Sequence, residues 1–286
     1  MNERAVMPNL FVPGFAKSGT SHLCSVLSRS DDIFLPHEKE PHYFSDDLVP
    51  DSYRTNESTY LSFYHKAMSR YRLDGSVSYM YSHRAFENIV SACDAPCFLI
   101  LVRHPFDRMV SHYKFNVRNG VEKRSFPDAV RNLDGFKQQW LYDYYEMSDY
   151  DPQVKRLLNS VESSTQVRMI DYRDYREDPE GVVGRIAEYL EVDVPLDEML
   201  HKVVNVSKKP KFPLINDIIR VDKGWKQVAK SAIPFKLRRS IKKYVHNKNI
   251  SEVDIPYMQD RYTDELKSEF DEMYVKFMSE YRGLYI

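Results

Sequence analysis

A loop near the start of the chain has the residue types and spacing needed to hold a phosphate-like anion. It reads Pro13-Gly-Phe-Ala-Lys-Ser-Gly-Thr-Ser21, and Gly14 and Gly19 are spaced as in a phosphate-binding P-loop. Backbone N–H groups at a helix N-terminus converge on such an anion, and the Lys17 ammonium adds positive charge. A chance turn is the alternative for a single loop of this kind. The predicted anion contacts are Ala16, Lys17, Ser18, Gly19, Thr20 and Ser21.

The loop lacks the parts that a magnesium-dependent nucleotide triphosphatase uses. Thr20 and Ser21 follow the second glycine, where such an enzyme has lysine and then serine or threonine; here the lysine lies inside the loop. The most apolar later segment ends in Arg103 and not in a magnesium-binding aspartate. The pattern therefore predicts a phosphate held by lysine and backbone amides, with no metal ion.

A second candidate anion site follows in Leu101-Val-Arg-His-Pro-Phe-Asp-Arg-Met-Val-Ser-His-Tyr113. Arg103 stands where a predicted strand feeds a helix, and Ser111 shares a helix face with Arg108, three residues earlier. Arginine binds phosphate through a planar, forked set of donors. The alternative is that Arg103 pairs with a carboxylate and that Arg108 is solvated.

These two sites require a fold that brings the ends of separate strands together. Apolar segments at residues 9–12, 33–35, 72–76, 97–102 and 166–170 are predicted strands, and residues 18–27, 58–71 and 178–190 are predicted helices. Strands alternating with helices over long crossovers predict an α/β fold with a central parallel sheet flanked by helices. Ligands bind at the carboxyl ends of such strands, where residues 13–20 and 103–105 lie.

Composition narrows the class of protein. The 286 residues carry 41 basic and 42 acidic side chains, a net charge of −1, which gives no general attraction to nucleic acid. The length suits one domain. No secretory signal opens the chain, and the longest apolar run, residues 97–102, is too short to span a bilayer. Three cysteines without zinc-binding spacing suggest buried, reduced thiols, so we expect a cytoplasmic protein of the bacterial type.

Together the loop with Lys17 and the Arg103–Ser111 pair resemble the sulfotransferase superfamily. The loop resembles its 5′-phosphosulfate loop, and Arg103 with Ser111 resembles its 3′-phosphate site. The segment Ile170-Asp-Tyr-Arg-Asp-Tyr-Arg-Glu-Asp-Pro179 is also similar to a strand and helix start of that family. The resemblance implies a P-loop-like three-layer fold with about five strands. It also implies the donor 3′-phosphoadenosine 5′-phosphosulfate (PAPS), the product 3′-phosphoadenosine 5′-phosphate (PAP) and no metal.

The resemblance also implies a catalytic base. In heparan-sulfate-type and many bacterial sulfotransferases a Lys-Glu-Pro/Ile-His-Phe-Phe stretch carries the glutamate base, and here the stretch is His37-Glu-Lys-Glu-Pro-His-Tyr-Phe44. The base maps onto Glu40, with His42 as the second candidate. An acceptor hydroxyl has to lose its proton during transfer, and Lys17 would stabilise the leaving phosphate. The alternative is that residues 38–40 form a solvated loop.

Two departures from the heparan-type pattern concern donor and acceptor contacts. Gly75 stands where those enzymes have a catalytic lysine. The segment Asp222-Lys-Gly-Trp-Lys226 only partly resembles their Lys-Gly-Arg motif, so Lys223 and Lys226 are candidate donor contacts. By analogy Tyr172 would line the adenine pocket, and a core tyrosine is the alternative.

The last third of the chain is predicted to close over the site. We expect a single domain over residues 1–286, with a donor-binding core at 1–190 and a helical lid and acceptor-side elaboration at 191–286. Residues 236–248 predict an amphipathic basic helix. It would dock with a solvated face, cover the donor, contact an anionic acceptor or touch a membrane surface peripherally. The oligomeric state is not indicated.

The hypothesis that follows is a PAPS-dependent sulfotransferase, with a glycan or glycolipid hydroxyl as the first candidate acceptor. A small-molecule or lipid alcohol is the alternative acceptor. A P-loop kinase or nucleotide hydrolase, and a non-catalytic nucleotide-binding protein, are the alternative functions.

Overall fold

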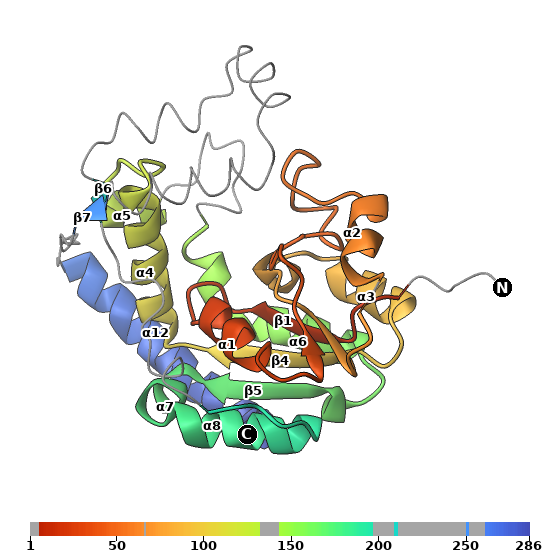
Figure 1. Ribbon diagram of the computed structural model, residues 1–286. Helices are drawn as coiled ribbons and strands as arrows, with labels where there is room; N and C mark the ends of the chain where they lie inside the picture. The colour runs from red at the N-terminus through yellow and green to blue at the C-terminus, as the bar shows by residue number, and fades with distance from the viewer. Residues whose placement is uncertain (1–5, 66, 132–142, 197–208, 211–249, 252–260) are drawn as a thin grey trace, which may run out of the picture.

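Five parallel strands form the centre of the molecule in the order β2-β3-β1-β4-β5 (Figure 1). The computed structural model describes residues 6–65, 67–131, 143–196, 209–210, 250–251 and 261–286. Because β1 lies between β3 and β4, the chain moves to one side of β1 for β2 and β3, and to the other for β4 and β5. The strands are β1 (Leu10–Gly14), β2 (Ile33–Phe34), β3 (Tyr71–Asp74), β4 (Cys97–Val102) and β5 (Val167–Asp171).

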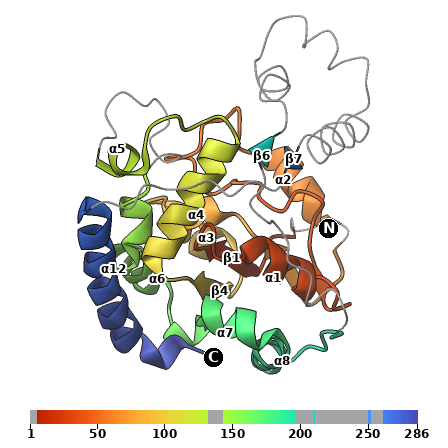
Figure 2. The same cartoon turned by 90° about the vertical axis from the view of Figure 1, so that its left-hand side faces the viewer.

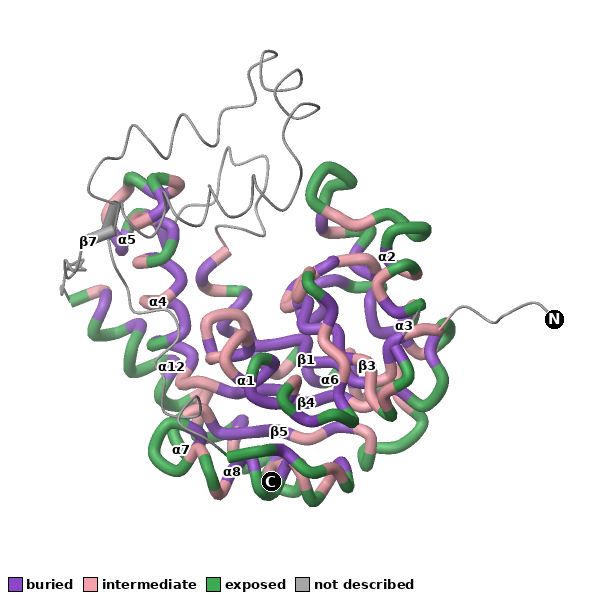
Figure 3. The backbone as a smooth tube through the Cα atoms, in the orientation of Figure 1, coloured by how far each residue is buried: buried purple, intermediate pink, exposed green. Residues whose placement is uncertain are grey.

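The central strands are buried on both faces, as the continuous apolar sequence of β4 predicts (Figure 3). Successive side chains of a strand point to opposite faces. Phe98 and Ile100 of β4 therefore join one core cluster, and Leu99 and Leu101 join the other. Phe11 of β1 stacks on Phe98, with ring centroids 5.4 Å apart, which ties β1 to β4 on the first face.

Each face of the sheet has its own helical layer, which gives the predicted three layers. The core cluster on one face is completed by α1 (Thr20–Leu27) and α8 (Pro179–Leu190). The cluster on the other face includes α2 (Glu57–Tyr64), η1 (Val77–Met80), α3 (Ala85–Ala92) and α6 (Tyr150–Ser160). Each of the four connections between successive strands contains at least one helix, because parallel strands need long crossovers.

A third apolar cluster joins α4 (Pro105–Arg118), α5 (Phe126–Arg131) and the C-terminal helix α12 (Arg261–Glu280). Figure 2 shows α12 running along the side of the molecule next to α4. Phe270 of α12 is buried in this cluster. Phe277, two turns later, is buried in the core cluster that also contains Phe98. The remaining short elements are η3 (Glu146–Ser148), η4 (Ser164–Gln166), α7 (Tyr172–Glu177), β6 (Lys209–Pro210), β7 (Ile250–Ser251) and η6 (Arg282–Leu284).

The predicted strands and helices agree with the observed elements to within one or two residues at most ends. The helix predicted over residues 58–71 is too long, because α2 ends at Tyr64 and Tyr71 already pairs with Ile33 as the first residue of β3. Pairing of β3 with β1 and β2 overrides the helical pattern there. The division of the chain at residue 190 stays a prediction.

Cys24 and Cys93 are buried free thiols and Cys97 is half-buried. No helix within the described ranges combines the length and the apolar composition that crossing a membrane requires.

Removing side-chain volume from the sheet core should destabilise the protein strongly. Leu99 is fully buried on β4, so Leu99→Ala should lower the free energy of unfolding by about 2–5 kcal/mol through lost burial and a residual cavity. Leu196→Ala is the matched control, because that leucine is 51% exposed and its loss should cost about 0.5 kcal/mol or less. Denaturant unfolding of both variants measures the difference; equal losses would contradict this account of the core.

Candidate active site

A cavity of about 450 Å³ opens at the carboxyl ends of β1 and β4. This is where the strand order reverses direction around β1, the usual ligand position in open α/β sheets. Its walls come from the β1–α1 loop, α4, η1, the start of α7 and the segment that carries Glu40. The lining residues are Ala16, Lys17, Gly19, Thr20, Ser21, His22, Glu40, Val77, Ser78, Tyr81, Arg103, Ser111, His112, Phe115, Asn116, Arg118, Met147 and Tyr172.

The β1–α1 loop is held in place by hydrogen bonds to β4 and to Tyr81. The Phe15 N–H donates to the Leu101 carbonyl of β4 over 2.8 Å, and the Ala16 N–H donates to the Tyr81 hydroxyl over 3.1 Å. Gly19, at the N-cap of α1, has φ 91°, a left-handed conformation that glycine adopts without strain. The loop therefore turns sharply enough to present the first N–H groups of α1 to the cavity.

Lys17 lies in a strongly positive surrounding. Its Nζ is 3.9 Å from the centre of the Phe115 ring, a cation–π contact. Burial, together with the charges of Arg118, Arg108 and Arg103, lowers the pKa of Lys17 to about 8. This ammonium thus lacks a strong anionic partner among the described residues, and a bound anion would raise its pKa again.

Arg103 and Tyr172 form the wall beside the loop. The Arg103 Nη1 donates to the Lys17 carbonyl over 3.2 Å, and its guanidinium carbon lies 5.0 Å from the centre of the Tyr172 ring. The Arg103 Nε is buried, and no partner for it is present among the described residues. Tyr172 is half-buried against Gly19 and lines the cavity, so the alternative of a core tyrosine is wrong.

One face of α4 lines the cavity, and only one of its residues there, Ser111, was predicted from the sequence. Ser111 lines the cavity as expected, and so do Phe115 and Arg118, four and seven residues later on the same helical face. That periodicity, counted from Ser111, is the signal that finds them in the sequence. Burial lowers the pKa of Arg118.

Arg108 does not lie on the cavity wall. It is fully buried, with Nε donating to the Ser148 hydroxyl and Nη2 to the Tyr144 carbonyl, each over 2.9 Å. The alternative that Arg108 is solvated is therefore wrong. Its Nη1 lies 3.5 Å from the Nδ1 of His112, which lines the cavity, and its charge helps to lower the pKa of Lys17.

Glu40 reaches the cavity from the loop after β2. Its Oε1 accepts from the Lys39 Nζ over 2.7 Å, and the same ammonium donates to the Thr20 hydroxyl over 3.2 Å. Thr20 is the first residue of α1, so one lysine joins the carboxylate to the phosphate loop. The Glu40 side chain is 30% exposed and Lys39 is 19% exposed, which contradicts the alternative of a fully solvated loop.

His42 lies behind Glu40 and does not line this cavity. Its Nε2 is 3.8 Å from the Glu40 Oε2, and its Nδ1 shares a hydrogen bond of 2.8 Å with the Ser78 hydroxyl. Ser78 in turn bonds Ser45 over 2.6 Å. Burial lowers the pKa of His42 despite the nearby Glu40, so the ring is neutral at pH 7.

The structure brings most of the predicted site residues together around the cavity. Ser18 is the exception in the loop, because it is fully buried and its hydroxyl has no partner among the described residues. Lys223 and Lys226 lie outside the described residues, as does the basic segment 236–248. The described part of the chain holds no group of three or more histidine, cysteine or carboxylate side chains placed to bind a metal ion. The predicted residues that line the cavity are Ala16, Lys17, Gly19, Thr20, Ser21, Glu40, Arg103, Ser111 and Tyr172.

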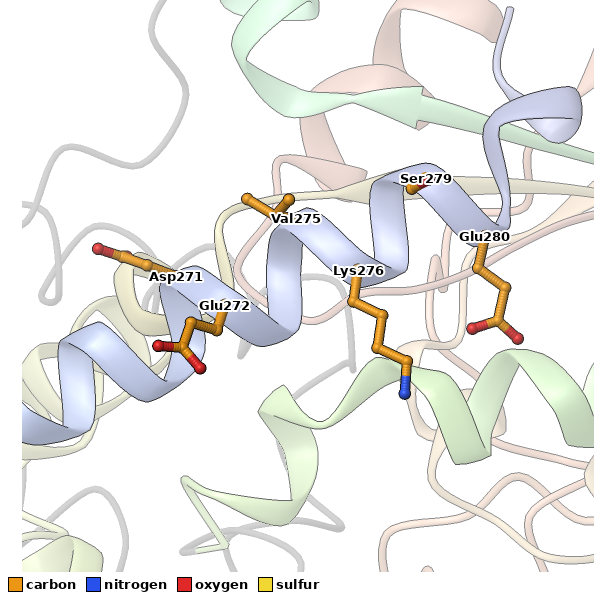
Figure 4. A pocket seen from close by; sticks show the side chains of 6 residues that line it. All are labelled: Asp271, Glu272, Val275, Lys276, Ser279 and Glu280. Carbon is orange, nitrogen blue, oxygen red and sulfur yellow. The ribbon is translucent and has the colours of Figure 1, made fainter.

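Glu40 also borders a second hollow of about 750 Å³ on its other side. This hollow combines rings with hydroxyl groups and lies between residues 37–42 and α2. A third hollow lies along the outer surface of α12, where Figure 4 shows Lys276 and Glu280 on one side of the helix. Among the described residues, that hollow is lined by α12 alone. The second hollow is lined by His37, Glu38, Glu40, His42, Ser52, Tyr53, Arg54, Thr55, Thr59 and Phe63.

Gly19 should tolerate no side chain. A Cβ there would combine φ 91° with a contact of 3.2 Å to the Tyr172 ring, so Gly19→Ala should lower the free energy of unfolding by about 1 kcal/mol or more. Gly184→Ala is the matched control, because Gly184 lies inside α8 with open space around it and should gain about 0.5–1 kcal/mol. Thermal or denaturant unfolding distinguishes them, and stabilisation by both substitutions would contradict the strained turn.

Comparisons with known proteins agree with this geometry. A family model described as the sulfotransferase domain matches residues 7–278. A sulfotransferase structure from Alicyclobacillus acidocaldarius is 28% identical, with a TM-score of 0.60, over 68% of this chain and 88% of that one. The sulfotransferase domain from the curacin biosynthetic pathway is 15% identical, with a TM-score of 0.50, over 93% and 98% of the two chains, and shares the fold.

A search of curated proteins gave no significant match. The family model spans almost the whole chain, including the phosphate loop, Glu40, Arg103 and the first turns of α12. The chain therefore belongs to the sulfotransferase family and is a sulfotransferase enzyme.

Proposed function

We propose that this sulfotransferase moves the sulfuryl group of PAPS to a hydroxyl group of an acceptor. The observation that carries the proposal is one cavity shared by Lys17, Arg103, Ser111 and Glu40. Lys17, Arg103 and Arg118 are cationic, and Glu40 is the one carboxylate among its described lining residues. A volume of about 450 Å³ lies in the range of small-molecule sites. Size and charge thus fit a nucleotide that carries two anionic groups.

The lining residues divide between the two ends of the donor. Bound PAPS supplies an activated sulfur–oxygen bond to a phosphate. Lys17 and the first N–H groups of α1 hold that phosphate and stabilise its growing charge. Arg103 and Ser111 hold the 3′-phosphate, where the forked arginine donors suit a phosphate group. Tyr172 presents a ring face beside Arg103 for the nucleotide base.

Glu40 acts as the general base. As the acceptor oxygen forms its bond to sulfur, the carboxylate takes the hydroxyl proton. The bond between sulfur and the bridging phosphate oxygen breaks at the same time, and its electron pair leaves with PAP. The remaining contribution of the protein is positioning, because Glu40 borders both the cavity proposed for the donor and the second hollow. His42, behind Glu40, is the second candidate base.

The second hollow is the place we assign to the acceptor, with a glycan or glycolipid as the first candidate. Tyr53 is 63% exposed at its rim, and Phe63 lies against His37, with ring centroids 4.9 Å apart. The hydroxyl groups of Ser52, Thr55 and Thr59 also line it. Ring faces beside hydroxyl groups suit a surface that is partly apolar and partly hydroxylated. A small-molecule or lipid alcohol is the alternative acceptor.

Transfer of labelled sulfate from PAPS tests this proposal against a panel of neutral oligosaccharides, glycolipids, lipid alcohols and small phenols. Lys17→Ala and Glu40→Gln should each lower transfer by about 100- to 1000-fold, since each removes a group that acts on the reacting atoms. Lys155→Ala and Glu272→Gln are matched surface controls on α6 and α12 and should leave transfer unchanged. Undiminished transfer in both site variants would overturn the assigned roles.

The same preparation tests the alternative functions. Family membership favours sulfuryl over phosphoryl transfer. A kinase or hydrolase predicts magnesium-dependent ATP turnover, and a non-catalytic protein predicts PAP binding without transfer to any acceptor. Contact of residues 236–248 with a membrane surface stays a prediction, because they lie outside the described residues.

The affinity for PAP should fall at alkaline pH. Since the pKa of Lys17 is about 8 without ligand, the lysine carries its full charge below that pH and loses it above. Of the two forms of this lysine only the ammonium attracts the phosphate, so affinity should be level near pH 7 and fall above pH 8, by less than about tenfold per pH unit because the α1 N–H groups and Arg103 still bind the donor. Equilibrium dialysis with labelled PAP measures this. Lys17→Arg is the control, because arginine stays charged and the decline should disappear; the same decline in both proteins would contradict the assignment.

A further inference from the structure

The Lys39 side chain fills a narrow space between the phosphate loop and Glu40, the candidate base. Its Nζ donates to the Glu40 Oε1 over 2.7 Å and to the Thr20 hydroxyl over 3.2 Å. Its carbonyl accepts from the Gly75 N–H over 3.1 Å. A Cβ on Gly75 would lie 2.7 Å from the Lys39 Cε and 3.0 Å from the Cys24 Sγ. The missing side chain at Gly75 is therefore what leaves room for the lysine stem.

The surroundings keep the lysine charged. Burial alone would lower the pKa of Lys39, but the nearby acidic groups, Glu40 first among them, together outweigh burial and the pKa is raised. The other titratable groups facing it are the Cys24 thiol and the buried Asp74 carboxyl. Burial raises the pKa of Cys24 to about 12, so that thiol stays neutral. Glu40 is consequently the direct acid partner of the ammonium.

This contact makes the two oxygens of Glu40 unequal. Oε1 is held by the ammonium, whereas Oε2 faces the neutral His42 ring, 3.8 Å from its Nε2. His42 is itself fixed, with its N–H donating to the Ser76 hydroxyl over 3.0 Å and its Nδ1 bonded to Ser78. A charge-assisted hydrogen bond to one oxygen favours the ionised carboxylate and fixes its rotation.

We propose that Lys39 is a positioning residue that anchors the Glu40 Oε1 and leaves Oε2 to take the acceptor proton. The inference rests on the proposed function of Glu40 as base. It adds a role for a residue that touches the base and the phosphate loop but none of the reacting atoms. Through Thr20, the same contact places the base at a fixed distance from the donor loop.

The test follows the Glu40 carboxyl directly by NMR, in protein labelled at the glutamate carboxyl carbons. Glu40→Gln identifies the signal by its disappearance. In Lys39→Met, and in Lys39→Gln, which keeps a hydrogen-bond donor without charge, the signal should shift and broaden, because the ammonium no longer holds Oε1 in one position. Lys155→Met is the matched control and should leave it in place, because Lys155 pairs with Asp151 on the surface. PAP binding confirms that each variant is folded.

Turnover gives the second readout. With water in place of the acceptor, slow PAPS hydrolysis should fall about 10- to 100-fold in Lys39→Met. Gly75→Ala, which crowds the lysine without removing it, should lower hydrolysis by less.

The outcomes separate this inference from the proposed function. A Glu40 signal that keeps its wild-type position and line width in both Lys39 variants overturns the role of Lys39, even if their turnover falls. In that case an inactive Glu40→Gln variant leaves the base assignment intact. Full activity in Glu40→Gln overturns the base assignment instead, and the role of Lys39 with it.

Discussion

The pairing of β1 with β4 sets the position of the groups that line the cavity. Both strands are buried on both faces and run parallel, so the loop after β1 and Arg103 after β4 leave the sheet at the same edge. The hydrogen bond from the Phe15 N–H to the Leu101 carbonyl continues this pairing into the loop. The starts of α1 and α7 and one face of α4 then line the same cavity, and β3, on the other side of β1, leads to Gly75 against Lys39 and to Ser78 on the cavity wall.

The strands and the two segments that line the cavity could be predicted because their signals are local. A continuous apolar run identifies β4, and glycines and Lys17 at fixed spacing identify the loop. Arg103 and Arg108 look alike in the sequence, yet one lines the cavity and the other is buried against Ser148, a contact set by tertiary packing. Lys39 is a similar case, since its place depends on the absent side chain of Gly75 in a distant segment.

The near-neutral chain carries a locally unbalanced site. Lys17, Arg103 and Arg118 line the cavity opposite a carboxylate that is already bonded to Lys39. Two of these cations contact neutral groups. Lys17 lies over the Phe115 ring, and Arg103 donates to the Lys17 carbonyl and lies over the Tyr172 ring. Such contacts stabilise a cation without cancelling its charge, so the cavity keeps its attraction for anions.

The low pKa of Lys17 has a calorimetric consequence. Near pH 8 about half of the ligand-free molecules hold this lysine as a neutral amine, whereas an anion beside it requires the ammonium. Binding then draws a proton from the solution, and the buffer that supplies it contributes its own heat of ionisation. The same complex will therefore show different apparent binding enthalpies in phosphate and in Tris, and the slope of that dependence counts the protons taken up.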